Sequence, residues 1–135
     1  MDDNCIFCKI IDGELEGSFV YEGDQVVAFM DINQPNHYKV LVCTRRHAPM
    51  IYDINDDEAA AVMQVSRRIA QAIQGITECP GMSVFQNNGA IAYQDVFHFH
   101  LHLLPRYADD DRRRRHVESR EVLDKLAADL RAALE

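Results

Sequence analysis

The chain has 135 residues, which is enough for one well-packed domain and too few for two ordinary ones. Hydrophobic residues make up 47% of it and charged residues 27%, and the formal net charge of −8 argues against a general affinity for the nucleic-acid backbone. The N-terminus lacks the basic start and apolar run of a secretory signal, and no stretch is long enough to span a bilayer. We therefore expect a cytoplasmic protein that binds neither nucleic acid nor membranes and has one active centre per chain.

The first half of the chain predicts a short helix followed by three strands. The helix is expected over residues 4–12, with Asn4 as its N-cap and Gly13 just beyond its end. The strands are expected in apolar runs bounded by glycine, proline or asparagine: residues 18–22, 26–30 and 37–44. The first two runs predict a β-hairpin, and the third has a nearly continuous apolar end that favours a central place in the sheet.

A long helix is predicted to follow. Asn55 has the form of an N-cap, and Glu58 stands at the spacing that a capping box requires. Apolar residues then recur every three or four positions on one stripe: Val62, Val65, Ile69, Ile73 and Ile76. Gly75 and Pro80 are expected to end this helix, which would pack on the sheet through its apolar stripe.

The last part of the chain predicts two more strands and a final helix. Residues 82–86 form the fourth expected strand, and the histidine-rich stretch that ends near Arg106 forms the fifth. The charge run of residues 109–115 is expected to be a solvated loop rather than a phosphate-binding site. The final helix is expected to start at about Ser119, with an apolar stripe of Val122, Leu123, Leu126 and Leu130.

Three histidines at every second position are the most informative feature of the sequence. In a strand, His98, His100 and His102 would line one face at intervals of roughly 6.6 Å, while Phe99 and Leu101 would face the core. A helix would point the three rings in different directions. Three unpaired polar rings on one face are costly unless something binds there, so this face is expected to be functional.

A neutral imidazole can attack phosphorus or accept a proton at physiological pH. Because His100 is central, its neighbours can donate hydrogen bonds to a substrate phosphate, and His100 is the natural nucleophile. The competing interpretation is a catalytic metal site, because His-x-His pairs on a strand also bind zinc or iron. The nearby carboxylate, Asp95, would point to the opposite face of a regular strand and would not complete such a site.

The chain has four cysteines, of which Cys5 and Cys8 form a Cys-x-x-Cys pair. In a reducing compartment this pair suggests metal binding or redox chemistry more than a disulfide. A thioredoxin-like redox centre would need a strand before the pair, and nothing precedes it to supply one. Metal binding is therefore favoured, while Cys43 and Cys79 are expected to be packing residues.

Together these residues resemble the histidine triad (HIT) family. The signature is His98-φ-His100-φ-His102-φ-φ, preceded by Gln94 and followed by Pro105-Arg106, where φ is apolar. Residues 5–11 are similar to the start of the Hint-like nucleotide-binding branch of that family. The resemblance extends to about Tyr107, so we expect one HIT domain over residues 1–135 whose tail, from about residue 108, matches weakly.

This resemblance implies an α+β fold in which a five-stranded antiparallel sheet carries one long helix, with the C-terminal helix in addition. It also implies a homodimer with a continuous sheet. The implied activity is hydrolysis or transfer at the α-phosphate of purine nucleoside phosphoramidates, acyl-nucleotides or dinucleoside polyphosphates, through a nucleotidyl-histidine intermediate. The purine would belong to adenosine or guanosine.

The resemblance also implies roles for individual residues. Catalysis falls to three histidines: His98, His100 and His102. Nucleotide binding falls to six residues: Phe7, Asp31, Ile32, Asn87, Gln94 and His102. Among these, Asp31 would bind the ribose hydroxyls, Asn87 and Gln94 would contact phosphate, and the purine would rest near Phe7 and Ile32.

A structural zinc ion is expected by analogy with certain bacterial members of the same branch. Its ligands would be Cys5, Cys8, His47 and His98, two thiolates and two imidazoles that make a closed tetrahedral set. His98 would then be oriented by zinc, which leaves the phosphate chemistry to His100 and His102.

Two departures from the family pattern bear on substrate choice. Tyr93 stands where many relatives have glycine, and Asp95 stands where some have serine. A carboxylate beside a phosphate would repel it, so either Asp95 turns away or the substrate preference differs. The alternative function is a nucleotide-binding regulatory protein whose turnover is incidental.

Overall fold

The computed structural model describes residues 2–135. Its elements in chain order are α1 (Ile6–Asp12), β1 (Phe19–Glu22), β2 (Val26–Met30), β3 (Val40–Thr44), the 3-10 helix η1 (Ile51–Asp53), α2 (Asp56–Thr77), β4 (Gly81–Phe85), the 3-10 helix η2 (Ala90–Ala92), β5 (His100–Arg106) and α3 (Arg120–Leu134). The α+β class is confirmed. None of the helices in these residues is both long and apolar enough to cross a membrane.

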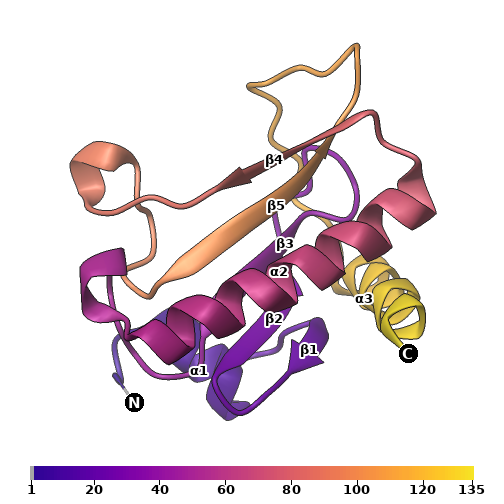
Figure 1. Ribbon diagram of the computed structural model, residues 1–135. Coiled ribbons are helices and arrows are strands. Elements are labelled where there is room, and N and C mark those ends of the chain that lie inside the picture. Colours follow the sequence, from indigo (N-terminus) through magenta and orange to yellow (C-terminus); the bar gives the residue numbers. More distant parts are fainter. Residues whose placement is uncertain (1) are drawn as a thin grey trace.

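The five strands form one antiparallel sheet in the order β1-β2-β3-β5-β4, with β3 at its centre as predicted. Figure 1 shows α2 lying across one face of this sheet with α3 beside it. The main core lies between that face and the two helices, where Val42 and Leu103 of the sheet meet Ile69 of α2 and Leu130 of α3. On the opposite face a smaller cluster joins α1 to β2 and β3 through Phe7, Phe29 and Leu41.

Helix α2 forms largely as its sequence predicts. Asn55 is the N-cap and completes a capping box with Glu58, which satisfies two of the free N–H groups at the helix start. The predicted stripe is buried from Val62 to Ile73, whereas Ile76 is 39% exposed. The helix ends at Thr77, between Gly75 and Pro80 as predicted, and is capped by Glu78 in the left-handed conformation.

Three other boundaries differ from the predictions. The N-cap of α1 is Cys5 and not Asn4, since the Cys5 sulfur accepts the Cys8 N–H. Strand β3 begins at Val40 because Tyr38 adopts a left-handed φ of 76°, which interrupts an extended chain. Strand β5 begins at His100, and the residues before it bend. His98 therefore lies before the strand, and the alternation of side chains along β5 does not determine where its ring points.

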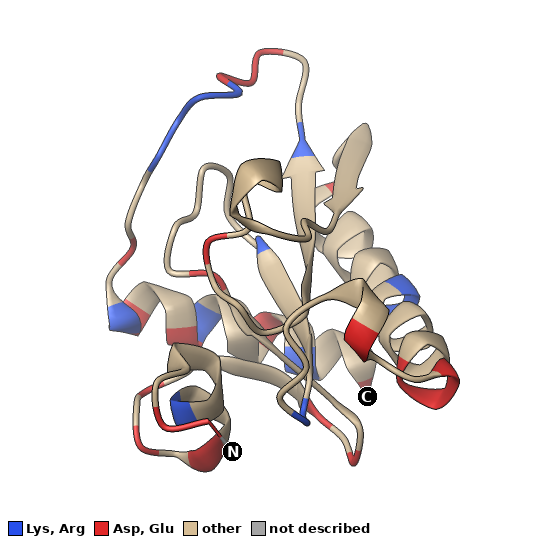
Figure 2. Cartoon of the chain, turned by 90° about the vertical axis from the view of Figure 1, so that its left-hand side faces the viewer, with Lys and Arg blue, Asp and Glu red and all other residues tan. Residues whose placement is uncertain are grey.

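The charge run lies on the long loop between β5 and α3, where Figure 2 shows its acidic and basic halves in succession. Its four arginines are exposed, in agreement with the prediction of a solvated loop. The returning part of this loop is held beside residues 32–34. The Gln34 N–H donates to the His116 carbonyl at 2.7 Å, and the Glu118 N–H donates to the Ile32 carbonyl at 3.0 Å. Ser119 then caps α3, whose start agrees with the predicted start at about Ser119.

Candidate functional site

A cavity of about 350 Å³ opens on the α1 side of the sheet and contains most of the predicted nucleotide-binding residues. Its apolar walls include Phe7, Ile10, Phe29 and Ile32, and its charged and polar walls include Asp31, Lys39, Asp95, His100 and His102. The size lies within the usual range for small-molecule sites. The structure thus brings together five predicted residues from α1, the β2–β3 loop and β5: Phe7, Asp31, Ile32, His100 and His102.

The ring of His100 is buried and held in one orientation. Its Nδ1–H donates to the His98 carbonyl at 2.8 Å, which leaves the lone pair on Nε2. Burial lowers the pKa of His100, and the hydrogen bond to His98 and the nearby carboxylates offset only part of this effect. A neutral imidazole with a free Nε2 is the form that a nucleophile requires.

Asp95 faces His100, with its Oδ1 3.6 Å from Nε2. The expectation that Asp95 would point away is wrong, because residue 95 lies outside the strand and its alternation does not apply. The Asp95 side chain is 77% exposed, so water screens much of its charge. The carboxylate nevertheless stands at the cavity wall where an incoming phosphate would approach His100.

His102 lies beside His100, with ring centroids 4.8 Å apart. Its ring stacks on Phe85 at 4.2 Å and an interplanar angle of 8°. Burial and the nearby Lys39 ammonium lower the pKa of His102 to about 3, so the ring is neutral at physiological pH. Its Nδ1 is buried and has no hydrogen-bond partner among residues 2–135, an arrangement that is costly in a protein that binds nothing there.

Asp31 and Lys39 form a buried ion pair on the same cavity wall. Lys39 Nζ lies 2.9 Å from Asp31 Oδ2, and the two side chains are 8% and 15% exposed. Asp31 Oδ1 also accepts the Asn33 N–H at 2.9 Å. Lys39 was not among the predicted site residues, although a lysine directly before a buried strand is a signal, because a buried charge needs a partner.

The loop residues Asn87 and Gln94 do not line this cavity in the described part of the chain. Gln94 is buried and braces the loops: its Nε2 donates to the Pro49 and Val96 carbonyls, and its Oε1 accepts the Gly89 N–H. Asn87 donates to the Tyr93 carbonyl at 3.4 Å. Contact of Asn87 and Gln94 with phosphate therefore stays a prediction.

Two arginines that were not predicted as site residues also border the cavity. Arg115 ends the charge run, and Arg120 begins α3. Arg120 donates to the Ser18 hydroxyl at 2.8 Å and lies 3.4 Å from the Glu16 carboxylate. The C-terminal part of the chain thus contributes side chains to the cavity, which the charge pattern alone did not indicate.

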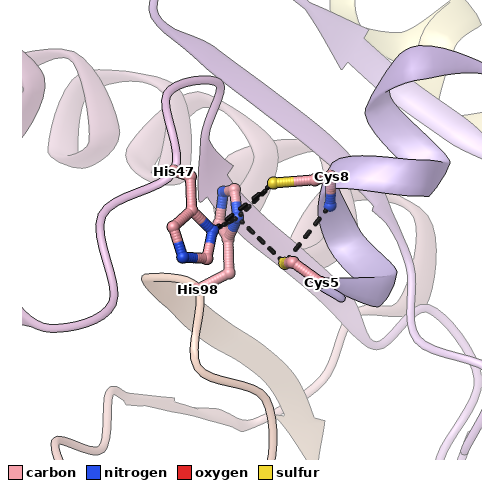
Figure 3. A group of neighbouring side chains, drawn as sticks. All are labelled: Cys5, Cys8, His47 and His98. Carbon is pink, nitrogen blue, oxygen red and sulfur yellow. Dashed lines mark hydrogen bonds between the residues drawn. The ribbon is translucent and has the colours of Figure 1, made fainter. Parts of the chain in front are cut away.

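A second group of side chains gathers beneath α1, where Cys5, Cys8, His47 and His98 come together (Figure 3). His98 Nδ1 lies 3.4 Å from the Cys5 sulfur, 3.5 Å from the Cys8 sulfur and 3.3 Å from His47 Nδ1. His47 Nδ1 lies 3.4 Å from the Cys8 sulfur. These four residues form a group that could hold a metal ion.

The chemistry of this group fits a tetrahedral metal site. Around a tetrahedral zinc ion, nitrogen and sulfur ligand atoms lie about 3.3–3.8 Å from one another. The four distances given above fall in this range, and all the ligand atoms of the group lie within 4.8 Å of one another. The His98 Nε2–H donates to the Thr44 carbonyl at 2.6 Å, which leaves the Nδ1 lone pair directed at the group. Burial lowers the pKa of His98 to about 4 and so keeps that lone pair free of a proton.

Comparison with known proteins agrees with this geometry. The family model described as HIT domain matches residues 12–109. A Hit-like protein from Bartonella henselae is 32% identical, with a TM-score of 0.92 and 98% of each chain covered. A Zn-bound histidine triad family protein from Mycobacterium smegmatis is 31% identical, with a TM-score of 0.84 and coverage of 97% of this chain and 93% of that one.

Among characterised relatives, the adenosine 5′-monophosphoramidase HNT1 of Saccharomyces cerevisiae is 36% identical over 106 residues, which are 78% of this chain and 65% of HNT1. The chain belongs to the HIT family. The family and the five-stranded fold expected from the triad are therefore both confirmed.

Proposed function

We propose that this protein hydrolyses or transfers nucleotides at the α-phosphate of purine nucleoside phosphoramidates, acyl-nucleotides or dinucleoside polyphosphates, through a covalent nucleotidyl-His100 intermediate. The observation that carries the proposal is the orientation of His100, whose Nδ1–H is tied to the His98 carbonyl while Nε2 stays free at a nucleotide-sized cavity. Similarity to the phosphoramidase HNT1 supports the same reaction class. The whole of residues 1–135 would act as a single HIT domain.

The walls of the cavity support a definite placement of the substrate. The purine, adenine or guanine, would lie among Phe7, Ile32 and their apolar neighbours, and the ribose hydroxyls would bind Asp31. The α-phosphate would then reach His100, with His102 donating a hydrogen bond to a non-bridging oxygen. Asn87 and Gln94 would contact the phosphate only if their loop moves, because Gln94 already has its hydrogen-bond partners.

The reaction would proceed in two displacements. His100 Nε2 attacks the α-phosphorus, a P–N bond forms, and the bond from phosphorus to the leaving group breaks as that group takes up a proton from solvent. Water then attacks the same phosphorus and returns a proton to solvent, the P–N bond to His100 breaks to leave a neutral ring, and the nucleoside monophosphate leaves. Two steps with histidine as the intermediate nucleophile replace one difficult displacement.

The Cys5–Cys8–His47–His98 group is proposed to hold a structural zinc ion. The set of two thiolates and two imidazoles, its fit to tetrahedral spacing and the Zn-bound relative support zinc. When bound, zinc would link α1 to the residues that precede β5. His98 would then orient His100 through its carbonyl rather than take part in the chemistry itself.

A homodimer is proposed as the working form. Strand β4 pairs only with β5, so its outer edge is open among the described residues, and Val84 and Phe85 on it are 50% and 37% exposed. The neighbouring Ile91 and Tyr93 are 98% and 86% exposed.

The other edge strand, β1, is short and is partly covered by Arg131, which donates to the Phe19 carbonyl at 2.6 Å. Pairing of two β4 edges would cover the apolar surface and extend the sheet.

Turnover of adenosine 5′-phosphoramidate by the wild type and by His100→Ala tests the proposed function. We expect the wild type to release ammonia and the nucleoside monophosphate, and we expect His100→Ala to lose a factor of about 10³ or more in kcat. Adenosine monophosphate should still bind to the variant. Equal binding by both proteins with no turnover by either would instead favour the nucleotide-binding regulatory role.

A further inference from the structure

We propose that Lys39 is the cation that holds the substrate phosphate in this cavity, and that Asp31 positions it for that task. The inference rests on the proposed function, because it assigns the phosphate end of the same nucleotide site. It starts from the burial of Lys39, whose side chain is only 8% exposed although it carries a positive charge.

The backbone around Lys39 is fixed on both sides. The Lys39 N–H donates to Gln34 Oε1 at 3.0 Å, and the Lys39 carbonyl accepts from Gln34 Nε2 at 2.8 Å and from the Asp31 N–H at 3.2 Å. Gln34 is itself 1% exposed. The side chain therefore starts from a rigid point at the beginning of β3, where it shares a sheet face with Leu41 and so with His102 of β5.

The ammonium group lies between the two ends of the nucleotide site. It is 2.9 Å from Asp31 Oδ2 on the ribose side and 5.8 Å from the centre of the Phe85 ring, which stacks on His102. Lys39, Asp31 and His102 all line the same cavity. A phosphate bound against His100 and His102 would thus lie near a positive charge that is already desolvated.

The hydrogen-bonding capacity of the ammonium is largely unused. An ammonium has three N–H donors, and the one polar group close to Lys39 Nζ among residues 2–135 is Asp31 Oδ2, with which it forms an ion pair at 2.9 Å. The Asp31 carboxylate has about four lone-pair sites, of which Lys39 and the Asn33 N–H take two. Asp31 can therefore hold the ribose hydroxyls and the ammonium together, while Lys39 keeps donors for phosphate oxygens.

A purely structural ion pair would have a different consequence. A structural pair would support adenosine and adenosine monophosphate equally, whereas a phosphate-binding cation contributes only to the ligand that carries a phosphate. The ratio of the two dissociation constants, adenosine over adenosine monophosphate, therefore separates the two roles. A substitution at a buried position can also damage the site in general. Such damage weakens the binding of both ligands alike and therefore cancels in this ratio.

The test is calorimetric titration of adenosine and of adenosine monophosphate into the wild type, Lys39→Met, the double variant Asp31→Asn/Lys39→Met and the surface control Lys125→Met. We expect Lys39→Met to lower the ratio by about tenfold or more, since a charge-assisted hydrogen bond is lost. The double variant leaves no unpaired buried carboxylate, so it should fold even if Lys39→Met folds poorly. It should lower the ratio by a similar factor. Lys125 pairs with Asp129 on the exposed surface of α3, and its substitution should leave the ratio unchanged.

An unchanged ratio in a folded Lys39 variant would overturn the assignment, whether both affinities stay the same or both fall in parallel. Failure of the proposed function looks different, because it would appear as absence of adenosine 5′-phosphoramidate turnover by the wild type, whereas the ratio reports only on binding. Retention of the wild-type ratio in Lys39→Arg, which keeps the charge, together with its loss in Lys39→Met would support the electrostatic role.

Discussion

At the scale of single residues, the site combines a buried imidazole, that of His100, with an unexpected negative charge. Asp95 lies 3.6 Å from His100 Nε2 and should repel a bound phosphate, but only modestly because it is exposed. We predict that Asp95→Asn, which removes the charge and keeps the shape, binds adenosine monophosphate a few-fold more tightly, an effect of about 1 kcal/mol. Calorimetry at low salt would measure it.

The matched control for this substitution is Asp109→Asn, the same change on the exposed loop after β5. It should leave the affinity unaltered. Unchanged or weaker binding by Asp95→Asn would mean that Asp95 turns away when the phosphate arrives, or that it contacts the ligand favourably.

The buried imidazole of His102 gives a pH prediction. Its pKa in the folded protein is about 3, below the value near 6.5 that an unfolded chain has, so the unfolded state binds more protons between these limits. The stabilisation that comes from neutral His102 is fully present above about pH 6.5 and is lost as the pH falls. Between pH 6.5 and 5.5, the free energy of unfolding of the wild type should fall by about 1 kcal/mol more than that of His102→Gln.

Urea denaturation at the two pH values would measure this difference, with both proteins loaded with zinc so that the metal site contributes equally. Parallel pH dependences for the wild type and His102→Gln would show that His102 is not held neutral by burial.

Residue roles were predictable where they depend on composition and spacing, and not where they depend on local bends. The place of His100 in the cavity followed from the three alternate histidines, while its role as nucleophile stays a prediction. Asp95 was assigned to the wrong face because the strand was assumed to run through residue 95, whereas it begins at His100. Lys39 was missed because its partner Asp31 is eight positions away and reaches it only through the loop that Gln34 closes.

At the scale of elements, periodicity predicted the helices and strands well because each has one buried face. The buried stripe of α2 is an example, and its N-cap Asn55 was predicted from the capping-box spacing. Starts and ends were less predictable, because the left-handed Tyr38 and the bend before β5 leave no trace in a hydrophobic pattern. The path of the C-terminal loop past the cavity depends on backbone pairing between Asn33 and Val117, which no local pattern encodes.

We expect the short helix α1 to depend on the proposed metal site. It has seven residues, too few to be stable alone, and its N-cap is the proposed ligand Cys5. We predict about one zinc per chain in dialysed wild type, and little in Cys5→Ser/Cys8→Ser. Loss of the metal should lower the Tm by roughly 10 °C, because the binding free energy contributes to folding.

Elemental analysis and thermal unfolding check this prediction, and Cys79→Ala serves as the control because Cys79 is buried outside the metal group. It should keep the zinc. Wild type that is metal-free after purification without chelators would reject the site.

At the scale of the whole molecule, the open β4 edge predicts the assembly. A charge at Val84 would face its own copy across a twofold interface, so Val84→Glu should convert the dimer to a monomer at micromolar concentration. Sedimentation velocity would show the change. Leu15→Glu introduces the same charge in the loop between α1 and β1 and should leave the dimer intact. A monomeric wild type, or a dimer that Val84→Glu does not affect, would contradict the proposed interface.

The central claim is that His100 carries the nucleotide during turnover. The most direct measurement is mass spectrometry of protein mixed with an acyl-adenylate and quenched within one turnover in alkaline denaturant, since P–N bonds hydrolyse in acid. We predict a gain of one adenylyl group, localised by fragmentation to His100 within the peptide that also contains His98 and His102, and absent from His100→Asn. Label on another residue, or no label while turnover proceeds, would contradict it.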